Sequence, residues 1–373
     1  MSWSEHHSKS ERLSADAETF SRSGDKVLAA ELYRQSAEEE VLAFNAADEK
    51  KIRTRGITAV SAVALFYKGQ DYDRAEQTAY RMLGASLPPF ATDQLRNLLQ
   101  IIWTTGSAQK AGIKFVPGDV LVSVKGGQVI HGGAPLDLIM RRVEGIQSVL
   151  FRTVEMLLDK PFRKRGVPDS DIQSMFRPWL FQAPAGSYQF AVRMQEPEQM
   201  GLWEESRPKL DQVTHTFFTV LKASATDPEA ELGSLVPNAE YRGAFLKLAR
   251  NLAPSGHAFD SLEIRDASAP AEPMVTLGSD TRTGLNEAIR KLKPVSSLED
   301  DVETTVSGTL RAVHLDQDWL EITLTTDPPK HQRIEEAGEA LDDVVGPMVN
   351  RHVVVSVLQR GQKLIYRDIE VSE

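Results

Sequence analysis

Residues 178–195, PWLFQAPAGSYQFAVRMQ, carry the clearest hairpin pattern in the chain, and they decide its fold class. From residue 187 onward apolar and polar residues alternate, which is typical of a strand with one buried face. The apolar positions are Tyr188, Phe190, Val192 and Met194. A strand-like run at residues 179–181 precedes a Pro-Ala-Gly turn at residues 184–186. Two strands alone are marginal in water, so this apolar face requires helices or further strands against it.

The hairpin holds four of the 26 aromatic residues of the chain. An exposed aromatic face would suit the stacking of a base or of a peptide. Buried aromatic side chains are far more common than exposed platforms, and we therefore interpret these four as core.

The composition bounds the class of protein. A chain of 373 residues with 41% hydrophobic and 26% charged residues is typical of a globular protein with two or three domains. Cysteine is absent, which excludes disulfides, thiolate metal sites and cysteine nucleophiles. No apolar run approaches the roughly 18 residues of a membrane span, so we expect a cytoplasmic protein with no membrane partner.

The net charge of −10 is concentrated near the C-terminus. From Glu299 to the end there are 16 acidic and seven basic residues, against 37 and 36 in the preceding 298. Nucleic-acid binders concentrate lysine and arginine, so this segment has the opposite character.

The first 105 residues predict helices. A helix, a short glycine turn and a second helix occur around Gly24, and again 46 residues later around Gly69–Asp71. Small residues on the second helices, such as Ala29 and Ala75, resemble those of a tetratricopeptide-type repeat, although that repeat is about 34 residues long. A third helix is expected over residues 92–103, and residues 105–107 read as a linker. Such helix pairs either present a groove to a partner peptide or pack on the next domain.

Residues 106–294 predict one α+β domain that contains the hairpin. Helices are expected for about 24 residues after Pro135, over 210–225, after Asn238 and after Asp280, with strands at 261–267 and 274–278. Residues 303–373 predict three strands, a helix near 341–349 and two more strands. That order is typical of an OB-type small β-barrel, with an SH3-like barrel as the alternative.

One basic cluster follows the long helix. Its residues, with the arginine before the hairpin, are Lys160, Arg163, Lys164, Arg165 and Arg177. They are candidate contacts to a nucleic-acid backbone, to phosphate or to an acidic partner, and the alternative interpretation is a solvated loop.

No catalytic or metal motif is present. The sequence has no HExxH, no Walker loop, no GxGxxG and no GxSxG. We therefore expect no cofactor, no metal and no catalytic residue. An enzyme whose site gathers distant residues, such as His215 or His257, stays open as an alternative.

Several stretches together resemble a family of uncharacterised bacterial proteins with a tetratricopeptide-like helical N-terminus. They lie at residues 54–76, 132–139, 164–170, 177–192, 246–254 and 342–350. The resemblance implies a bacterial origin but no activity and no site residue.

The sequence predicts an α+β multidomain protein with a tetratricopeptide-like helical region at 1–105, a central α+β domain at 106–294 and a small acidic β-barrel at 303–373. The expected function is non-catalytic protein–protein interaction, as an adaptor in a bacterial cytoplasmic system. The alternatives are a nucleic-acid-binding component of a defence or stress system, and the enzyme described above.

Overall fold

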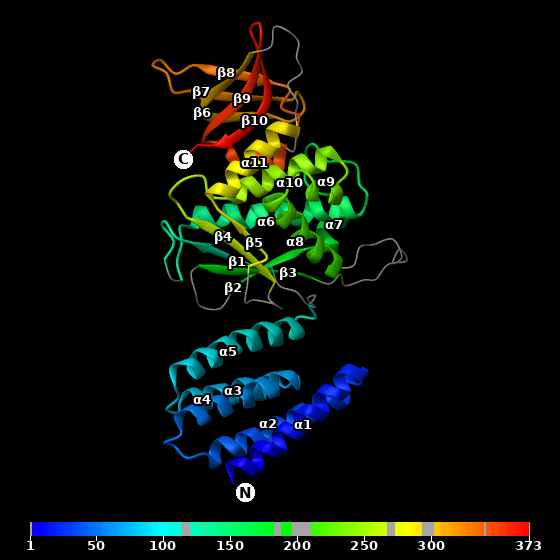
Figure 1. The fold of residues 1–373 in the computed structure, drawn as a ribbon, viewed down its shortest axis with the longest axis vertical. Coiled ribbons are helices and arrows are strands. Elements are labelled where there is room, and N and C mark those ends of the chain that lie inside the picture. The colour runs from blue at the N-terminus through cyan, green and yellow to red at the C-terminus, as the bar shows by residue number, and fades with distance from the viewer. Residues whose placement is uncertain are drawn as a thin grey trace. The chain divides into compact units, whose positions relative to one another are not determined.

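The chain combines helices and strands, with a helical N-terminal region and a sheet at its C-terminus, as the sequence predicts (Figure 1). The computed structural model describes residues 2–113, 120–130, 132–182, 188–195, 210–266, 273–292, 302–338 and 341–372. The predicted hairpin turn at 184–186 lies outside these residues. The chain divides into two compact units, residues 1–114 and 115–373, and each is described by itself. Within the described ranges, none of the helices has the length and apolar character that crossing a membrane requires.

The N-terminal unit is built of five helices, each packed on the next. They are α1 (Trp3–Ser23), α2 (Lys26–Ala46), α3 (Ile52–Lys68), α4 (Tyr72–Leu83) and α5 (Pro89–Lys110). Gly24 has a φ of 92°, which ends α1, and the Asp25 side chain then caps α2 by accepting from the Leu28 amide. Alanines with no exposed surface, among them Ala59 and Ala79, let neighbouring helices approach closely.

The predicted linker at residues 105–107 is wrong, because α5 continues through it to Lys110. The Thr105 hydroxyl donates to the Ile101 carbonyl over 2.8 Å and lies 3.4 Å from the Tyr67 hydroxyl of α3. These contacts hold the segment as helix although Gly106 lowers its intrinsic preference for that conformation.

The second unit holds an antiparallel five-stranded sheet of order β2-β3-β1-β4-β5. The strands are β1 (Val120–Lys125), β2 (Pro178–Gln182), β3 (Gln189–Met194), β4 (Ser261–Asp266) and β5 (Val275–Leu277). The hairpin predicted from the sequence is β2 and β3, paired from Pro178↔Met194 to Gln182↔Phe190. Phe190, Val192 and Met194 are buried in the core, whereas Leu180 on the edge strand is exposed.

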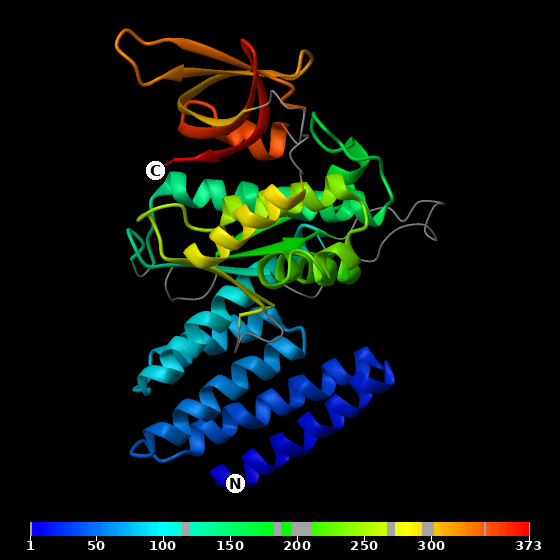
Figure 2. The ribbon, with the colours of Figure 1, turned by 45° about the horizontal axis from the view of Figure 1, so that its top comes forward.

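Helices gather on one face of this sheet (Figures 1 and 2). The long ones are α6 (Leu136–Leu157), α8 (Leu210–Thr226), α10 (Ala239–Leu252) and α11 (Ser279–Leu292), with short α7 (Ser170–Met175) and α9 (Glu231–Leu235). Asn238 caps α10 as its sequence position predicts, accepting from the Glu240 and Tyr241 amides. One buried core joins these helices, the sheet and the C-terminal strands.

The C-terminal strands form a second sheet in which the pairing returns to its start. The strands are β6 (Val302–His314), β7 (Trp319–Leu324), β8 (His331–Glu335), β9 (His352–Arg360) and β10 (Lys363–Val371). Their order is β10-β8-β7-β6-β9, and β9 also pairs with β10. A π-helical turn, η2 (Leu341–Val345), and a 3-10 turn, η3 (Gly346–Met348), connect β8 to β9.

A bulge interrupts β10. Tyr366 pairs with Val357 and Asp368 with Ser356, so Arg367 is an extra residue. The shift lets Tyr366 and Ile369 both face the interior of the sheet, and it directs Asp368 outward towards α10.

Candidate functional site

The basic loop after α6 lies against the acidic C-terminal segment. Arg163, a predicted contact residue, is largely buried, and its Nε donates to Glu155 Oε1 over 2.7 Å. Its Nη2 donates to Asp343 Oδ2 over 3.1 Å. Burial alone would lower the pKa of Arg163, but the two carboxylates outweigh it and raise that pKa. Arg163 is therefore a permanent interior charge and is not displayed to a partner.

The two predicted lysines of the loop are exposed and form surface ion pairs. Lys160 Nζ lies 3.4 Å from Asp169, and Lys164 Nζ lies 3.7 Å from Glu240. Exposed pairs of this kind contribute little to stability, so both lysines are accessible to an anion.

The two remaining predicted arginines do different things. Arg165 donates to the Leu315 carbonyl at the end of β6 and lies 3.9 Å from Asp316. Arg177 is exposed, with its guanidinium 5.8 Å from the centre of the Trp179 ring on β2. The structure therefore does not bring all five predicted residues together at one surface.

A fully buried arginine lies beneath the loop. Arg152 of α6 donates from Nε to Asp343 Oδ2 over 2.7 Å and from Nη1 to Glu155 Oε2 over 3.2 Å. Its guanidinium also lies 4.8 Å from the centre of the Phe162 ring. With Arg163, these residues make a buried network of two arginines and two carboxylates, in which each charge has opposite charges beside it.

A second charged contact joins α10 to β10. Arg250 is fully buried, and it donates to Asp368 and, over 2.6 Å, to the Ile369 carbonyl. Lys247 Nζ lies 3.6 Å from the same carboxylate. Burial would raise the pKa of Asp368, but Arg250 and Lys247 outweigh it and hold that pKa below the usual range.

Nothing in the sequence marks Arg152 or Arg250 as an interior charge, because both lie within ordinary helical patterns. One signal was available, namely the acidic excess after Glu299. A segment with that excess needs cations nearby, and helices α6, α10 and α11 supply them from inside the same chain.

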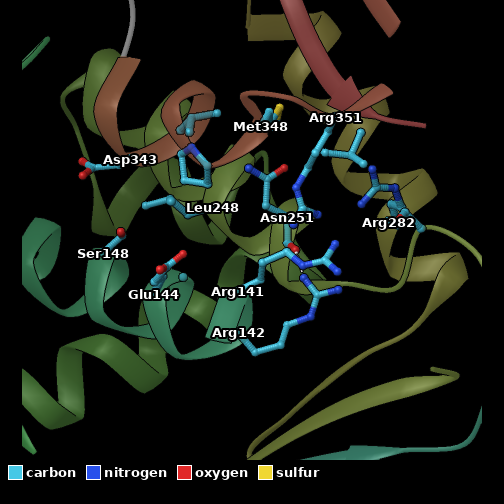
Figure 3. Close-up of a pocket in the computed structure, with 15 residues that line it drawn as sticks. Arg141, Arg142, Glu144, Ser148, Leu248, Asn251, Arg282, Asp343, Met348 and Arg351 are labelled. Atoms are coloured by element: carbon cyan, nitrogen blue, oxygen red, sulfur yellow. Dashed lines mark hydrogen bonds between the residues drawn. The ribbon is translucent and has the colours of Figure 1, made fainter. Parts of the chain in front are cut away.

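One cavity of the second unit lies between α6, α10 and the C-terminal segment (Figure 3). Its empty space of about 640 Å³ includes the open solvent at its mouth. Its charged lining residues are Arg141, Arg142, Glu144, Arg282, Asp343 and Arg351. In Figure 3 the four arginines lie on the side around Asn251, and Glu144 and Asp343 lie on the other.

Arg142 and Arg282 of this cavity are held by neighbouring segments, and Arg141 is ion-paired with Asp137, one turn earlier on α6. Arg142 is buried, donates to the Asn251 carbonyl and lies 4.5 Å from the centre of the Phe259 ring. Arg282 of α11 donates to the Arg250 carbonyl over 2.8 Å and to Glu370 over 3.1 Å. The cavity thus presents positioned guanidinium groups, and we call it the arginine pocket.

In the N-terminal unit, an aromatic pair is exposed where α4 and α5 meet. The ring centres of Tyr80 and Trp103 lie 6.3 Å apart, and Trp103 Nε1 donates to Glu76 Oε1 over 2.8 Å. Tyr80 is 54% exposed and Trp103 46%, so about half of each side chain is open to solvent. We call these three residues the aromatic patch.

The two histidines that the sequence offers for an enzyme site lie apart from the arginine pocket. His215 on α8 and His257 before β4 are exposed, and neither lines the arginine pocket. Across the described ranges, no three His, Asp or Glu side chains lie where they could hold a metal ion. The chain matches no protein-family model, no curated protein and no solved structure with which it was compared.

Proposed function

We propose that this protein is a non-catalytic protein–protein interaction or adaptor protein of a bacterial cytoplasmic system, and that its N-terminal helical unit binds the partner. The supporting observation is exposure. Of the 18 large apolar side chains that are exposed among the described residues, nine lie within residues 2–113. Residues 2–113 are about a third of the residues that the structure describes, yet they carry half of these side chains, and exposed apolar surface marks interaction sites.

Within that unit, the aromatic patch is the strongest candidate for the contact. Tryptophan and tyrosine dominate binding hot spots because each buries a large area at low cost in side-chain entropy. The hydrogen bond from Trp103 to Glu76 restricts the indole before a partner arrives, which lowers that cost further.

The paired helices support a tetratricopeptide-like interpretation of the unit. Helices α1 and α2, then α3 and α4, form consecutive pairs with tight turns and buried small residues, and α5 follows. Helical arrays of this kind use extended surfaces to bind peptides.

The C-terminal sheet supports an OB-type barrel as its fold. Strand β6 pairs with β7 and with β9, and β8 pairs in parallel with β10. The helical turn η2 lies between β8 and β9, that is, between the third and fourth strands of this sheet. This is the order of that five-stranded barrel. Because its acidic residues engage the arginines of the central domain, we assign it a structural or regulatory role.

The test is capture of partners from the native bacterium with the tagged full chain, with and without nuclease. A Tyr80→Ala/Trp103→Ala variant should lose a stoichiometric protein partner that wild type retains after nuclease treatment. Ile130→Ala, which changes another exposed apolar residue in the second unit, is the matched control and should retain it. Equal recovery by both variants would contradict the proposal, provided that circular dichroism shows both to be folded.

Nucleic acid is the second candidate partner, and the edge strand β2 favours it. Arg177 lies near the Trp179 ring, and the Arg193 guanidinium lies 4.8 Å from the centre of the Phe181 ring. Cations combined with aromatic rings are what proteins use to hold single strands. Partners that disappear on nuclease treatment, and binding that weakens with salt and in Arg177→Ala, would support this candidate instead.

A further inference from the structure

We propose that the partner of the N-terminal unit places a lysine or arginine side chain on the aromatic patch, with its cation against the face of the Trp103 indole and beside the Glu76 carboxylate. This inference rests on the proposed function, because it names the chemical group that the patch receives from that partner. A small cation can also occupy the patch, so the inference is testable before the partner is known.

The carboxylate of the patch has no cation of its own chain. Glu76 is partly buried on α4, and its Oε1 accepts from the neutral indole nitrogen of Trp103 over 2.8 Å. Across the described part of the chain, no lysine, arginine or histidine forms an ion pair with Glu76. By contrast, Asp73, one turn earlier on α4, lies 3.8 Å from Lys110. The negative charge of Glu76 is therefore unbalanced, and the patch attracts a positive group.

Two tryptophans of the second unit show how this chain treats a partly exposed indole. The Arg177 guanidinium lies 5.8 Å from the centre of the Trp179 ring. The Arg333 guanidinium lies 4.6 Å from the centre of the Trp319 ring. Trp103 has no such cation among the residues that the structure describes, although its side chain is more exposed than these two. A cation from another molecule can therefore take the place on Trp103 that an arginine of the chain takes on the other two rings.

The geometry lets one cation contact both the ring and the carboxylate. A cation is attracted to an aromatic face from within about 6 Å of the ring centre, and tryptophan attracts it most. The hydrogen bond from Nε1 places Oε1 of Glu76 at the edge of the indole, so a cation above the five-membered ring lies close to that oxygen as well. The Tyr80 ring centre, 6.3 Å from that of Trp103, provides a second aromatic ring beside the same position.

The carboxylate also decides between a cationic and an apolar side chain of the partner. An apolar group that covered the patch would remove water from Glu76 and give it no partner in return, which costs free energy. A lysine ammonium or an arginine guanidinium replaces that water with an opposite charge, while its aliphatic stem packs against the rings. The patch is therefore better suited to a basic segment of the partner than to an apolar one.

The test is a nuclear magnetic resonance titration of the full chain, isotope-labelled at its tryptophan indole nitrogens, with Nα-acetyl-lysine amide and with Nα-acetyl-norleucine amide. The norleucine probe keeps the aliphatic stem and lacks the charge. The indole signal of Trp103, identified by its loss in Trp103→Phe, should shift saturably with the lysine probe and stay in place with the norleucine probe. The signals of Trp179 and Trp319 are internal controls and should shift less, because an arginine already lies on each ring.

Variants of Glu76 separate its charge from its hydrogen bond. Glu76→Gln keeps an oxygen that accepts from the Trp103 indole, and it should weaken binding of the lysine probe about two- to fivefold, as expected for the loss of an exposed charge pair. Glu31→Gln removes an exposed carboxylate of α2, outside the patch, and should leave the affinity unchanged. In capture from the native bacterium, Glu76→Lys should lose the partner, because like charges repel.

The inference is overturned if the norleucine probe shifts Trp103 as much as the lysine probe does, if neither probe shifts it, or if Glu76→Gln binds the lysine probe like wild type. Partner capture distinguishes this failure from a failure of the proposed function. A partner that is lost by Tyr80→Ala/Trp103→Ala but retained by Glu76→Lys would leave the adaptor proposal standing and overturn the cationic contact. A partner that the double variant also retains would overturn both.

Discussion

Replacing Asp343 with alanine should destabilise the second unit. Its Oδ2 lies 2.6 Å from Nη2 of Arg152 and 3.1 Å from Nη2 of Arg163. Arg152 has no exposed side-chain surface. In the variant, Glu155 is the one carboxylate of this network left beside Arg152 and Arg163. Breaking a buried pair in this way costs about 3–5 kcal/mol. Since Glu155 remains, we expect about 3 kcal/mol, or roughly a 100-fold change in the unfolding equilibrium.

The assay is equilibrium urea unfolding of the full chain, followed by hydrogen exchange so that the second unit is observed separately. Asp316→Ala is the matched control, because Asp316 belongs to the same acidic segment and lies near the same loop but is 90% exposed. It should cause no measurable change. In the double variant Asp343→Ala/Arg152→Met the unpaired buried cation is gone, and part of the lost stability should return. Equal losses in the two single variants would refute the reasoning.

Two further predictions concern stability. Burial raises the pKa of the Glu40 carboxyl, and this effect outweighs the hydrogen bond to His7, which lowers that pKa. The protonated Glu40 therefore contributes to stability at low pH, and this contribution is lost as pH rises through the raised pKa. Glu40→Gln should therefore slow hydrogen exchange in α1 and α2 at pH 7 and lose this advantage near pH 4. Glu39→Gln should accelerate exchange at pH 7, because Lys9 and His6 lower the pKa of Glu39. A change of exchange rate in the same direction for both variants at pH 7 would contradict these pKa directions. Gly308→Ala should lower the free energy of unfolding in urea by about 1–3 kcal/mol, because its Cβ would lie 2.3 Å from the Thr323 carbonyl oxygen. Gly284→Ala is the control: its Cβ would enter open space on α11, and alanine should stabilise the helix slightly. Equal effects of the two variants would contradict the packing argument.

The fold was largely predictable because local patterns agreed with the tertiary structure. The alternation at residues 188–194 predicts a strand, and β3 forms there. Asn238 is predicted to cap a helix, and it caps α10. The errors arose where distant contacts overrode local preference. Residues 105–107 carry a glycine and two small polar residues, yet packing against α3 keeps them helical.

The candidate sites were less predictable. A basic cluster such as KPFRKRG is visible in the sequence, but burial decides which of its charges can reach a partner. Arg163 faces the interior because it binds Asp343, which lies 180 positions later in the chain. The arginine pocket draws on residues from 141 to 371, each unremarkable in its own helix or strand. Such a convergence depends on how helices pack on a sheet, which no local pattern records.

The bulge at Arg367 has a consequence for the evolution and engineering of β10. Because one extra residue separates Tyr366 from Ile369, the strand consists of two half-strands of opposite phase. If all these residues paired regularly without the bulge, either Tyr366 would turn to solvent, or Asp368 would turn into the core and away from Arg250. Deleting Arg367 alone would instead leave Tyr366 and Ile369 two positions apart and both facing inward, with their partners on β9 unchanged. The extra residue is therefore the one position of this part of β10 whose loss keeps the inward and outward faces as they are.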